Sequence, residues 1–130
     1  MRVIDSSALV KYFTREAGWE KVREVLIDGV VTLDLAIKEV ANALWKRVVR
    51  GEMGYDTALT IIRTLLEGAI PVVDGRDYLA RAFELAAKHK VTVYDALFIA
   101  LALEKSAELV TSDKLQAAAA EKAGVKVVVV

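Results

Sequence analysis

The stretch YDALFIALA, residues 94–102, determines how the rest of the chain must fold. Every residue from Ala96 to Leu103 is apolar. A helix that is apolar on all sides has to be covered by protein on all sides. The run is also far shorter than the roughly 20 residues that cross a bilayer. We therefore expect a helix buried in the centre of a globular fold, with the acidic Asp95 at its start.

Short apolar and β-branched runs alternate with helical patterns on both sides of this helix. The strands that we expect span residues 3–4, 30–33, 70–73, 108–111 and 125–130. We expect Ser6 and Ser7 to cap the first helix, and Asp34 and Asp56 to cap two later ones. The strand runs are continuous rather than alternating, which is typical of a parallel sheet covered on both faces. The sequence predicts an α/β fold, a three-layer α/β/α sandwich with a parallel five-stranded sheet.

The composition limits the chemistry that the chain can perform. With 130 residues, 55% of them hydrophobic, the chain has the size and apolar content of one domain, which we expect to span residues 1–130. No cysteine is present, which excludes disulfides, thiolate zinc sites and thiol nucleophiles. His89 is the only histidine, so the chain can hardly form a histidine-rich metal site. The 18 basic and 18 acidic residues balance, which argues against nucleic-acid binding through bulk positive charge. The side chains that remain as candidates for catalysis or metal binding are the carboxylates of Asp and Glu.

Acidic residues stand where the expected strands end, namely Asp5, Asp34, Asp74 and Asp113, and Asp95 begins the buried helix. In parallel sheets, ligands bind beyond the carboxyl ends of the strands, at the point where the strand order reverses. Each acid also has a simpler interpretation, because the helix dipole stabilises an acid in a first turn by under about 1 kcal/mol. Position alone does not separate these two interpretations.

Glu39 lies inside the expected third helix, on the face opposite its apolar residues. Asn42 and Lys46 follow at i+3 and i+7, so three polar side chains share that face. Such a set is most often a solvated surface. The only asparagine of the chain lies one turn from Glu39, which favours a site. The spacing leaves both interpretations open.

Three or four carboxylates gathered in one strand-end crevice would repel each other. Two like charges about 4 Å apart cost about 4 kcal/mol at an effective dielectric constant of about 20. Raised pKa values or a hard cation relieve this repulsion. Ligands that are all oxygen select Mg²⁺ or Mn²⁺. Such an ion can lower the pKa of a water molecule and contact a phosphate, which is an arrangement that cleaves phosphodiesters.

Four blocks of the sequence resemble the PIN-domain family, and within it the small VapC-type toxins of prokaryotic toxin–antitoxin pairs. The blocks are VIDSSAL (residues 3–9), EVANAL (39–44), YDALFIALA (94–102) and LVTSD (109–113). Together the blocks make the resemblance cover essentially the whole chain. The resemblance implies one PIN-like domain with a parallel five-stranded sheet between helices.

Carried over by position, the resemblance makes Asp5, Glu39, Asp95 and Asp113 an acidic quartet around Mg²⁺ or Mn²⁺. We expect Asp5 and Asp95 to bind the metal directly, and Glu39 and Asp113 to bind it directly or through water, or to orient the nucleophile. Asp34 and Asp74 are left with structural roles. The polar residues that the resemblance places in support of the quartet are Ser6, Asn42, Thr111 and Ser112.

The activity implied by the resemblance is that of an endoribonuclease toxin, in which a metal-activated water attacks an RNA phosphate. The implied partners are RNA, a VapB-type antitoxin that can place an arginine among the acids, and a second copy of the chain in a homodimer. The first residues lack the hydrophobic core of a signal peptide, so we expect a cytoplasmic protein with no membrane contact. The alternative is a non-catalytic PIN-like domain that binds RNA or acts as a scaffold.

Overall fold

The computed structural model describes residues 1–130, which form seven α-helices, one short 3₁₀ helix and five strands. The strands are β1 (Arg2–Ile4), β2 (Val30–Leu33), β3 (Val72–Val73), β4 (Leu109–Thr111) and β5 (Val127–Val129). The helices are α1 (Ser6–Phe13), α2 (Trp19–Asp28), α3 (Asp34–Val49), α4 (Tyr55–Leu66), α5 (Leu79–His89), α6 (Val93–Lys105) and α7 (Lys114–Lys122). The 3₁₀ helix, Gly75–Tyr78, precedes α5 directly.

The five strands form one parallel sheet in the order β3-β2-β1-β4-β5. In the centre, Val3 of β1 pairs with Val31 of β2 on one side and with Leu109 of β4 on the other. The chain first adds strands on one side of β1, and then returns to add β4 and β5 on the other side. The strand order therefore reverses between β1 and β4, which is where parallel sheets bind ligands.

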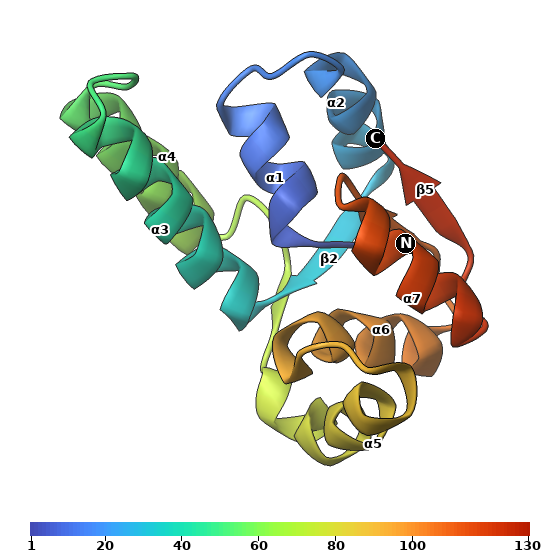
Figure 1. Cartoon of the computed structure of the whole chain (residues 1–130). Helices are drawn as coiled ribbons and strands as arrows, with labels where there is room; N and C mark the ends of the chain where they lie inside the picture. The colour runs from blue at the N-terminus through green and yellow to red at the C-terminus, as the bar shows by residue number, and fades with distance from the viewer.

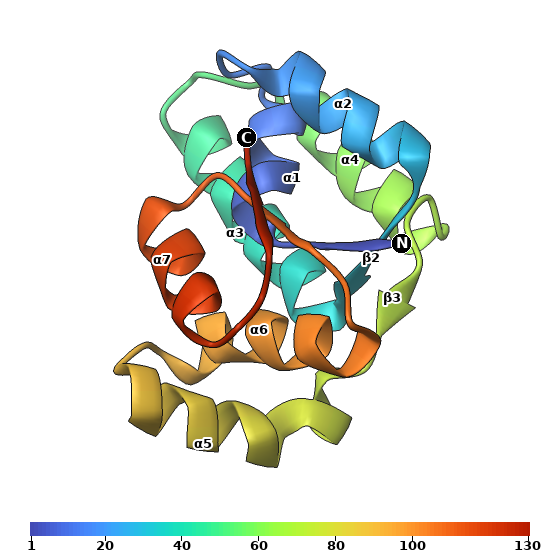
Figure 2. The ribbon, with the colours of Figure 1, turned by 90° about the vertical axis from the view of Figure 1, so that its right-hand side faces the viewer.

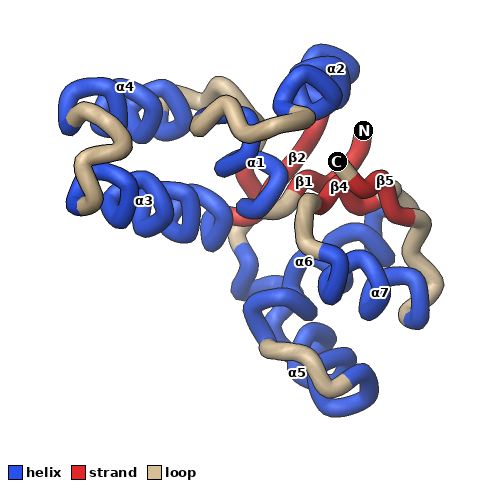
Figure 3. The backbone as a smooth tube through the Cα atoms, turned by 45° about the horizontal axis from the view of Figure 1, so that its top comes forward, coloured by secondary structure: helices blue, strands red, loops and turns tan.

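Helices cover both faces of the sheet, which confirms the three-layer sandwich. Figure 3 shows the strands in the middle, with α1 and α2 on one side and α6, α7 and α5 on the other. Helix α5 lies outside α6, away from the sheet (Figure 2). Helices α3 and α4 pack against each other as a pair that projects to one side of the molecule (Figure 1).

Helix α6 is the central element of the core, as its sequence predicts. All residues from Ala96 to Ala102 are buried, because the helix lies between the sheet and α5. Two of its large aliphatic side chains, Ile99 and Leu101, have no exposed surface. None of the helices combines the length and apolarity needed to cross a membrane.

The helix caps differ from the expected ones. Asp5 caps α1 and its side chain accepts a hydrogen bond from the backbone N–H of Ala8, so the expected caps Ser6 and Ser7 lie inside the first turn. A carboxylate is a good acceptor for free N–H groups at a helix start, and Asp5 comes first in the chain. The expected cap Asp56 is wrong as well, because α4 begins at Tyr55 and no side chain caps it.

The third strand and the start of α3 also differ in detail. Strand β3 covers only Val72–Val73, because Pro71 has no N–H and joins the sheet only as an acceptor, from the N–H of Thr32 at 3.1 Å. Asp34 is the first residue of α3 and not its cap. Its side chain instead accepts a hydrogen bond from the N–H of Gly75 at 3.0 Å.

Candidate functional site

The candidate site lies at the reversal of the strand order, where the carboxyl ends of β1 and β4 meet. Asp5 directly follows β1, and Asp113 follows β4 by two residues. The two strands are neighbours, since Ile4 pairs with Val110. Parallel strands end at the same edge of a sheet, so both acids reach one edge from distant parts of the chain.

Asp5 is almost completely buried, with 5% of its surface exposed, and hydrogen bonds hold both of its carboxylate oxygens. Oδ1 accepts from the hydroxyl of Ser7 at 2.7 Å and from the N–H of Ala8 at 3.1 Å. Oδ2 accepts a short hydrogen bond from the hydroxyl of Thr111, which is itself fully buried. The carboxylate of Asp5 is therefore fixed in position by β4 and by the first turn of α1.

A network of hydroxyl and backbone groups connects Asp5 to Asp113. The backbone N–H of Asp113 donates to Oγ1 of Thr111 at 3.0 Å, and that of Ser112 donates to Oγ of Ser7 at 2.9 Å. Asp113 caps α7, because its Oδ1 accepts hydrogen bonds from the first turn of that helix, from Leu115 at 2.8 Å. The end of β4 and the starts of α1 and α7 thus form one hydrogen-bonded unit.

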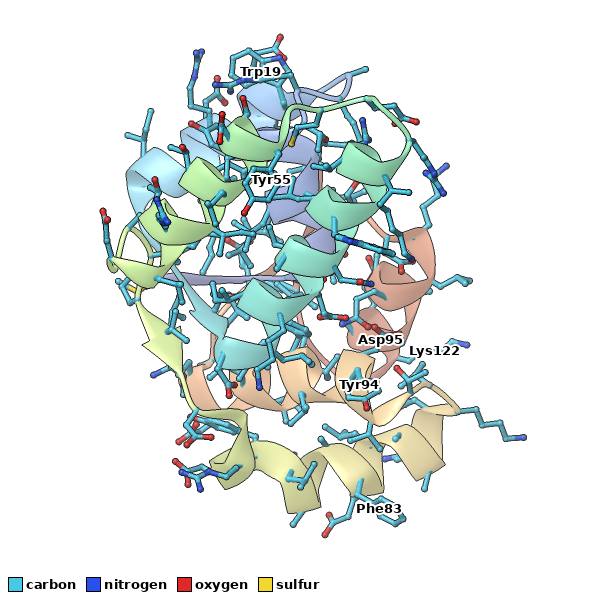
Figure 4. The ribbon with its side chains drawn as sticks, turned by 90° about the vertical axis from the view of Figure 1, so that its left-hand side faces the viewer. Trp19, Tyr55, Phe83, Tyr94, Asp95 and Lys122 are labelled. Carbon is cyan, nitrogen blue, oxygen red and sulfur yellow. The ribbon has the colours of Figure 1, made fainter.

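Glu39 and Asp95 approach this unit from two further helices. The hydroxyl of Ser6 donates to Oε1 of Glu39 at 3.2 Å, which attaches the middle of α3 to the start of α1. Asp95 lies in the first turn of α6, which is capped by Thr92. Figure 4 shows Asp95 at the start of that helix, on the side of the molecule where α7 lies.

Three of the candidate acids, Asp5, Glu39 and Asp95, have pKa values raised above their ordinary values. Burial raises the pKa of Asp5 above its ordinary value, although its hydrogen bonds from Thr111, Ser7 and Ala8 lower that pKa, and repulsion from Asp113 makes a smaller contribution to the rise. Burial also raises the pKa of Glu39, and the charges of Asp95 and Asp5 add to the shift. The pKa of Asp95 is raised by burial and then by Asp113. Each carboxylate therefore repels at least one other member of the group, as expected where acids meet at one sheet edge.

The donor atoms fit a hard divalent cation, since every candidate ligand is a carboxylate and hydroxyl groups lie close by. No group of three or more His, Cys, Asp or Glu side chains is arranged to hold a metal ion. Mg²⁺ usually keeps several waters and is bound through only one or two carboxylates. The oxygen donors of the site would therefore suit Mg²⁺ or Mn²⁺ rather than a softer metal.

A groove of about 440 Å³ lies between α1 and α3, and of the four candidate acids only Glu39 lines it. Its walls include Ser6 and Ser7 from α1, Glu39 and Asn42 from α3, and Ser112 from the loop after β4. A volume of this size is typical of pockets that bind small ligands. Asn42 and Ser112, which the resemblance places in support of the quartet, both line this groove.

The sequence did not predict a role at the site for Ser7 or Gln116. Ser7 lies between Asp5 and Thr111 and bonds to both, yet only its neighbour Ser6 was expected to support the site. Gln116 is buried, and its side-chain N–H₂ donates to the backbone carbonyl of Asp95 at 2.9 Å, which ties α7 to α6. In the sequence, the only signal for Gln116 is the capping-box pattern Asp113-x-x-Gln116, which predicts a contact within its own helix.

The other two strand-end acids are engaged elsewhere. Asp34 binds the N–H of Gly75, as described above, and Asp74 caps the 3₁₀ helix through the N–H of Arg76 at 2.9 Å. The guanidinium of Arg76 holds the pKa of Asp74 below its ordinary value. Asp34 follows β2 and Asp74 follows β3, and both strands lie on the far side of β1 from β4. The two acids therefore stand farther along the same sheet edge and not at the point where β1 and β4 meet.

The raised pKa values predict how stability depends on pH when no divalent cation is present. Between the ordinary pKa of a carboxyl and its raised value in the fold, the native state binds more protons than the unfolded state, so stability increases as the pH falls. We expect Asp95→Asn to melt above the wild type in EDTA at about pH 7, and this gap to narrow toward about pH 4. Differential scanning calorimetry measures the gap, and a gap that does not change with pH would contradict the assignment.

Comparison with known proteins places this site in a family. The model of the PIN domain family matches residues 2–122. Ribonuclease VapC3 from Pyrobaculum aerophilum is 39% identical over 116 residues, covering 86% of this chain and 88% of that protein.

Two solved structures share the fold. The crystal structure of PAE2754 from Pyrobaculum aerophilum aligns with a TM-score of 0.74 and 27% identity, covering 97% of this chain and 82% of the other. A toxin–antitoxin complex from Klebsiella pneumoniae aligns with a TM-score of 0.68 and 19% identity, covering 91% of each chain. The family match spans most of the sequence, and the sheet edge that carries Asp5 and Asp113 lies within it. The chain therefore belongs to the PIN-domain family.

Proposed function

We propose that the protein is an endoribonuclease that depends on Mg²⁺ or Mn²⁺ and hydrolyses RNA phosphodiester bonds. The observation that supports this proposal is the position of Asp5 at the strand-order reversal of a PIN fold, where burial, helped by the charges of Asp95 and Asp5, raises the pKa of Glu39. The 39% identity to a protein named as a ribonuclease supports the same class of reaction. A hard cation supplies charge for the phosphate and lowers the pKa of a water molecule.

The residues of the chain have distinct roles in this proposal. Asp5 and Asp95 would hold the cation directly, and the hydroxyl of Thr111 fixes the carboxylate of Asp5. Glu39 and Asp113 would bind the cation directly or through water, or orient the nucleophile. Ser6 positions Glu39 through the hydrogen bond between them. Because Asp5 is rigidly held and the other acids are less buried, we assign it the role of the fixed anchor of the site.

The biological setting of the proposal is that of a toxin. We propose that residues 1–130 act as one PIN domain, that the protein forms a homodimer, and that a VapB-type antitoxin blocks it in the cytoplasm. Support comes from the relatives, since the similar Pyrobaculum aerophilum protein carries the name VapC and a structure of the same fold comes from a toxin–antitoxin complex. The competing proposal is a PIN-like domain that binds RNA or acts as a scaffold without cleaving it.

Removal of the metal tests the proposed activity. We expect the protein to cut a circular single-stranded RNA in Mg²⁺ or Mn²⁺, because a circle has no ends for an exonuclease, and we expect EDTA to slow cutting by about 10²-fold or more. Gel analysis of the linear product measures this. RNA binding without cutting at any metal concentration would instead support the scaffold proposal. Calorimetric titration of Mn²⁺ into the wild type and Asp5→Asn is the control, since the site requires binding that depends on Asp5.

A further inference from the structure

The groove between α1 and α3 has a contact at each end that fixes its course. At the acid end, Ser6 of α1 binds Glu39 of α3 at 3.2 Å. At the far end, Glu16 follows α1 and pairs with Arg47 of α3 at 2.6 Å. Between these two contacts the groove of about 440 Å³ is open, and its wall on α3 carries Asn42 and then Lys46. The groove therefore leads from Glu39 along α3 toward Lys46.

Of the charged side chains along this groove, some are already paired and one is free to bind a ligand. Glu16 is neutralised, because Arg47 binds it and also approaches Glu52 at 3.8 Å. Lys46 is the only cation that lines the groove, and its exposed side chain forms no ion pair. A chain with equal numbers of acidic and basic residues offers no general attraction to a polyanion. A free ammonium in this place can therefore contribute much of the local attraction.

We propose that Lys46 is the centre of a phosphate-binding subsite, which holds a backbone phosphate of the RNA strand beside the one to be cleaved. Lys46 follows Glu39 by seven residues, which corresponds to about 10.5 Å along a helix. A strand that has one phosphate at the acids and lies along α3 brings a further phosphate to the ammonium group. Asn42, halfway along this wall, offers an amide to the nucleotide between them. The subsite rests on the proposed ribonuclease function and gives the substrate strand a direction.

Binding of RNA in the absence of cleavage tests the subsite. We would place each variant in an Asp95→Asn background and measure the binding of a single-stranded RNA by fluorescence anisotropy in Mg²⁺, over a range of salt concentrations. Lys46→Ala should weaken binding about three- to tenfold and reduce the salt slope by about 0.7, the contribution of one phosphate on a single strand. Lys46→Arg, which keeps the charge, should bind within about twofold of its parent.

A second variant should act in the opposite direction. Glu16→Gln removes a negative charge from the groove and loosens Arg47, so it should strengthen binding and steepen the salt dependence. Lys105→Ala is the matched control for both variants. It removes an equally exposed, unpaired lysine from the last turn of α6, at the opposite end of that helix from Asp95.

The outcomes separate the subsite from the activity. If the wild type cleaves RNA and Lys46→Ala binds RNA as Lys105→Ala does, the subsite is wrong and the nuclease proposal stands. If the wild type binds RNA without cleaving it and Lys46→Ala still lowers the salt slope, the subsite stands on a scaffold protein. Absence of any RNA binding would overturn both proposals.

Discussion

Asp95→Asn should lower the rate of metal-dependent RNA cleavage by about 10²- to 10³-fold, the usual cost of losing one preorganised charged group in an active site. Asp95 is the most informative acid for this test, because Thr92 and not Asp95 caps α6, so the fold does not need its charge. The raised pKa of Asp95 indicates that the charged carboxylate is costly in the fold without a cation. Single-turnover cleavage of a labelled RNA in saturating Mn²⁺ measures the loss.

Asp74→Asn provides the matched control. Asp74 also follows a strand and caps a helix, but it belongs to the opposite half of the sheet and pairs with Arg76 on the surface. We expect this variant to keep wild-type cleavage within about twofold, since Asn also caps helices and the ion pair with Arg76 lies on the surface, away from the proposed site. Equal activity of Asp95→Asn and the wild type would show that the cleavage comes from another site or from a contaminant.

Leu101→Ala should reduce the free energy of unfolding by about 2–5 kcal/mol, a large part of the stability of a domain of this size. Leu101 has no exposed surface and lies in the fully buried part of α6. The loss has two sources, the removal of buried methyl groups from the apolar interior and the cavity that remains. Because the start of α6 carries Asp95, this variant also tests how firmly the core holds the site.

Urea denaturation followed by circular dichroism measures this difference. Leu115→Ala makes the same chemical change at a residue of α7 that is 82% exposed, and we expect it to alter stability by less than about 0.5 kcal/mol. A comparable loss in both variants would mean that α6 is not the centre of the core. Titration of Mn²⁺ into Leu101→Ala below its melting temperature then shows whether the site survives.

Much of the fold could be predicted because its signals are local. The absence of any polar face from Ala96 to Leu103 required a covered helix, and α6 is buried between the sheet and α5. Continuous β-branched runs predicted a parallel sheet, which the strand pairing confirms. The boundaries of single elements were less predictable, because they depend on contacts with distant residues, as the pairing of Pro71 with Thr32 illustrates.

The grouping of the acids could not be obtained from local pattern. Asp5, Asp34, Asp74 and Asp113 all follow strands, and only the order of the strands in the sheet separates them. That order is set by how helices pack on the two faces, which no short stretch of sequence encodes. The resemblance to a family supplied a choice among the acids that spacing could not make.

The role of Gln116 was hidden for a similar reason. Its spacing from Asp113 matches a local capping motif, so the sequence offers an explanation confined to α7. In the structure the side chain of Gln116 reaches across to α6 and binds the carbonyl of Asp95. A side chain that bonds within its own turn and one that bonds to another helix look alike in the sequence, because the difference lies in the packing of the two helices.

Asp5 and Asp113 each cap a helix, whereas Glu39 and Asp95 cap none. A lineage that lost the proposed nuclease activity would still be selected to retain the first two, because losing a cap costs about 1 kcal/mol of stability. Mutations at the other two carry no such penalty and would accumulate freely. In relatives that have lost the proposed activity, substitutions should therefore appear at Glu39 and Asp95 before they appear at Asp5 and Asp113.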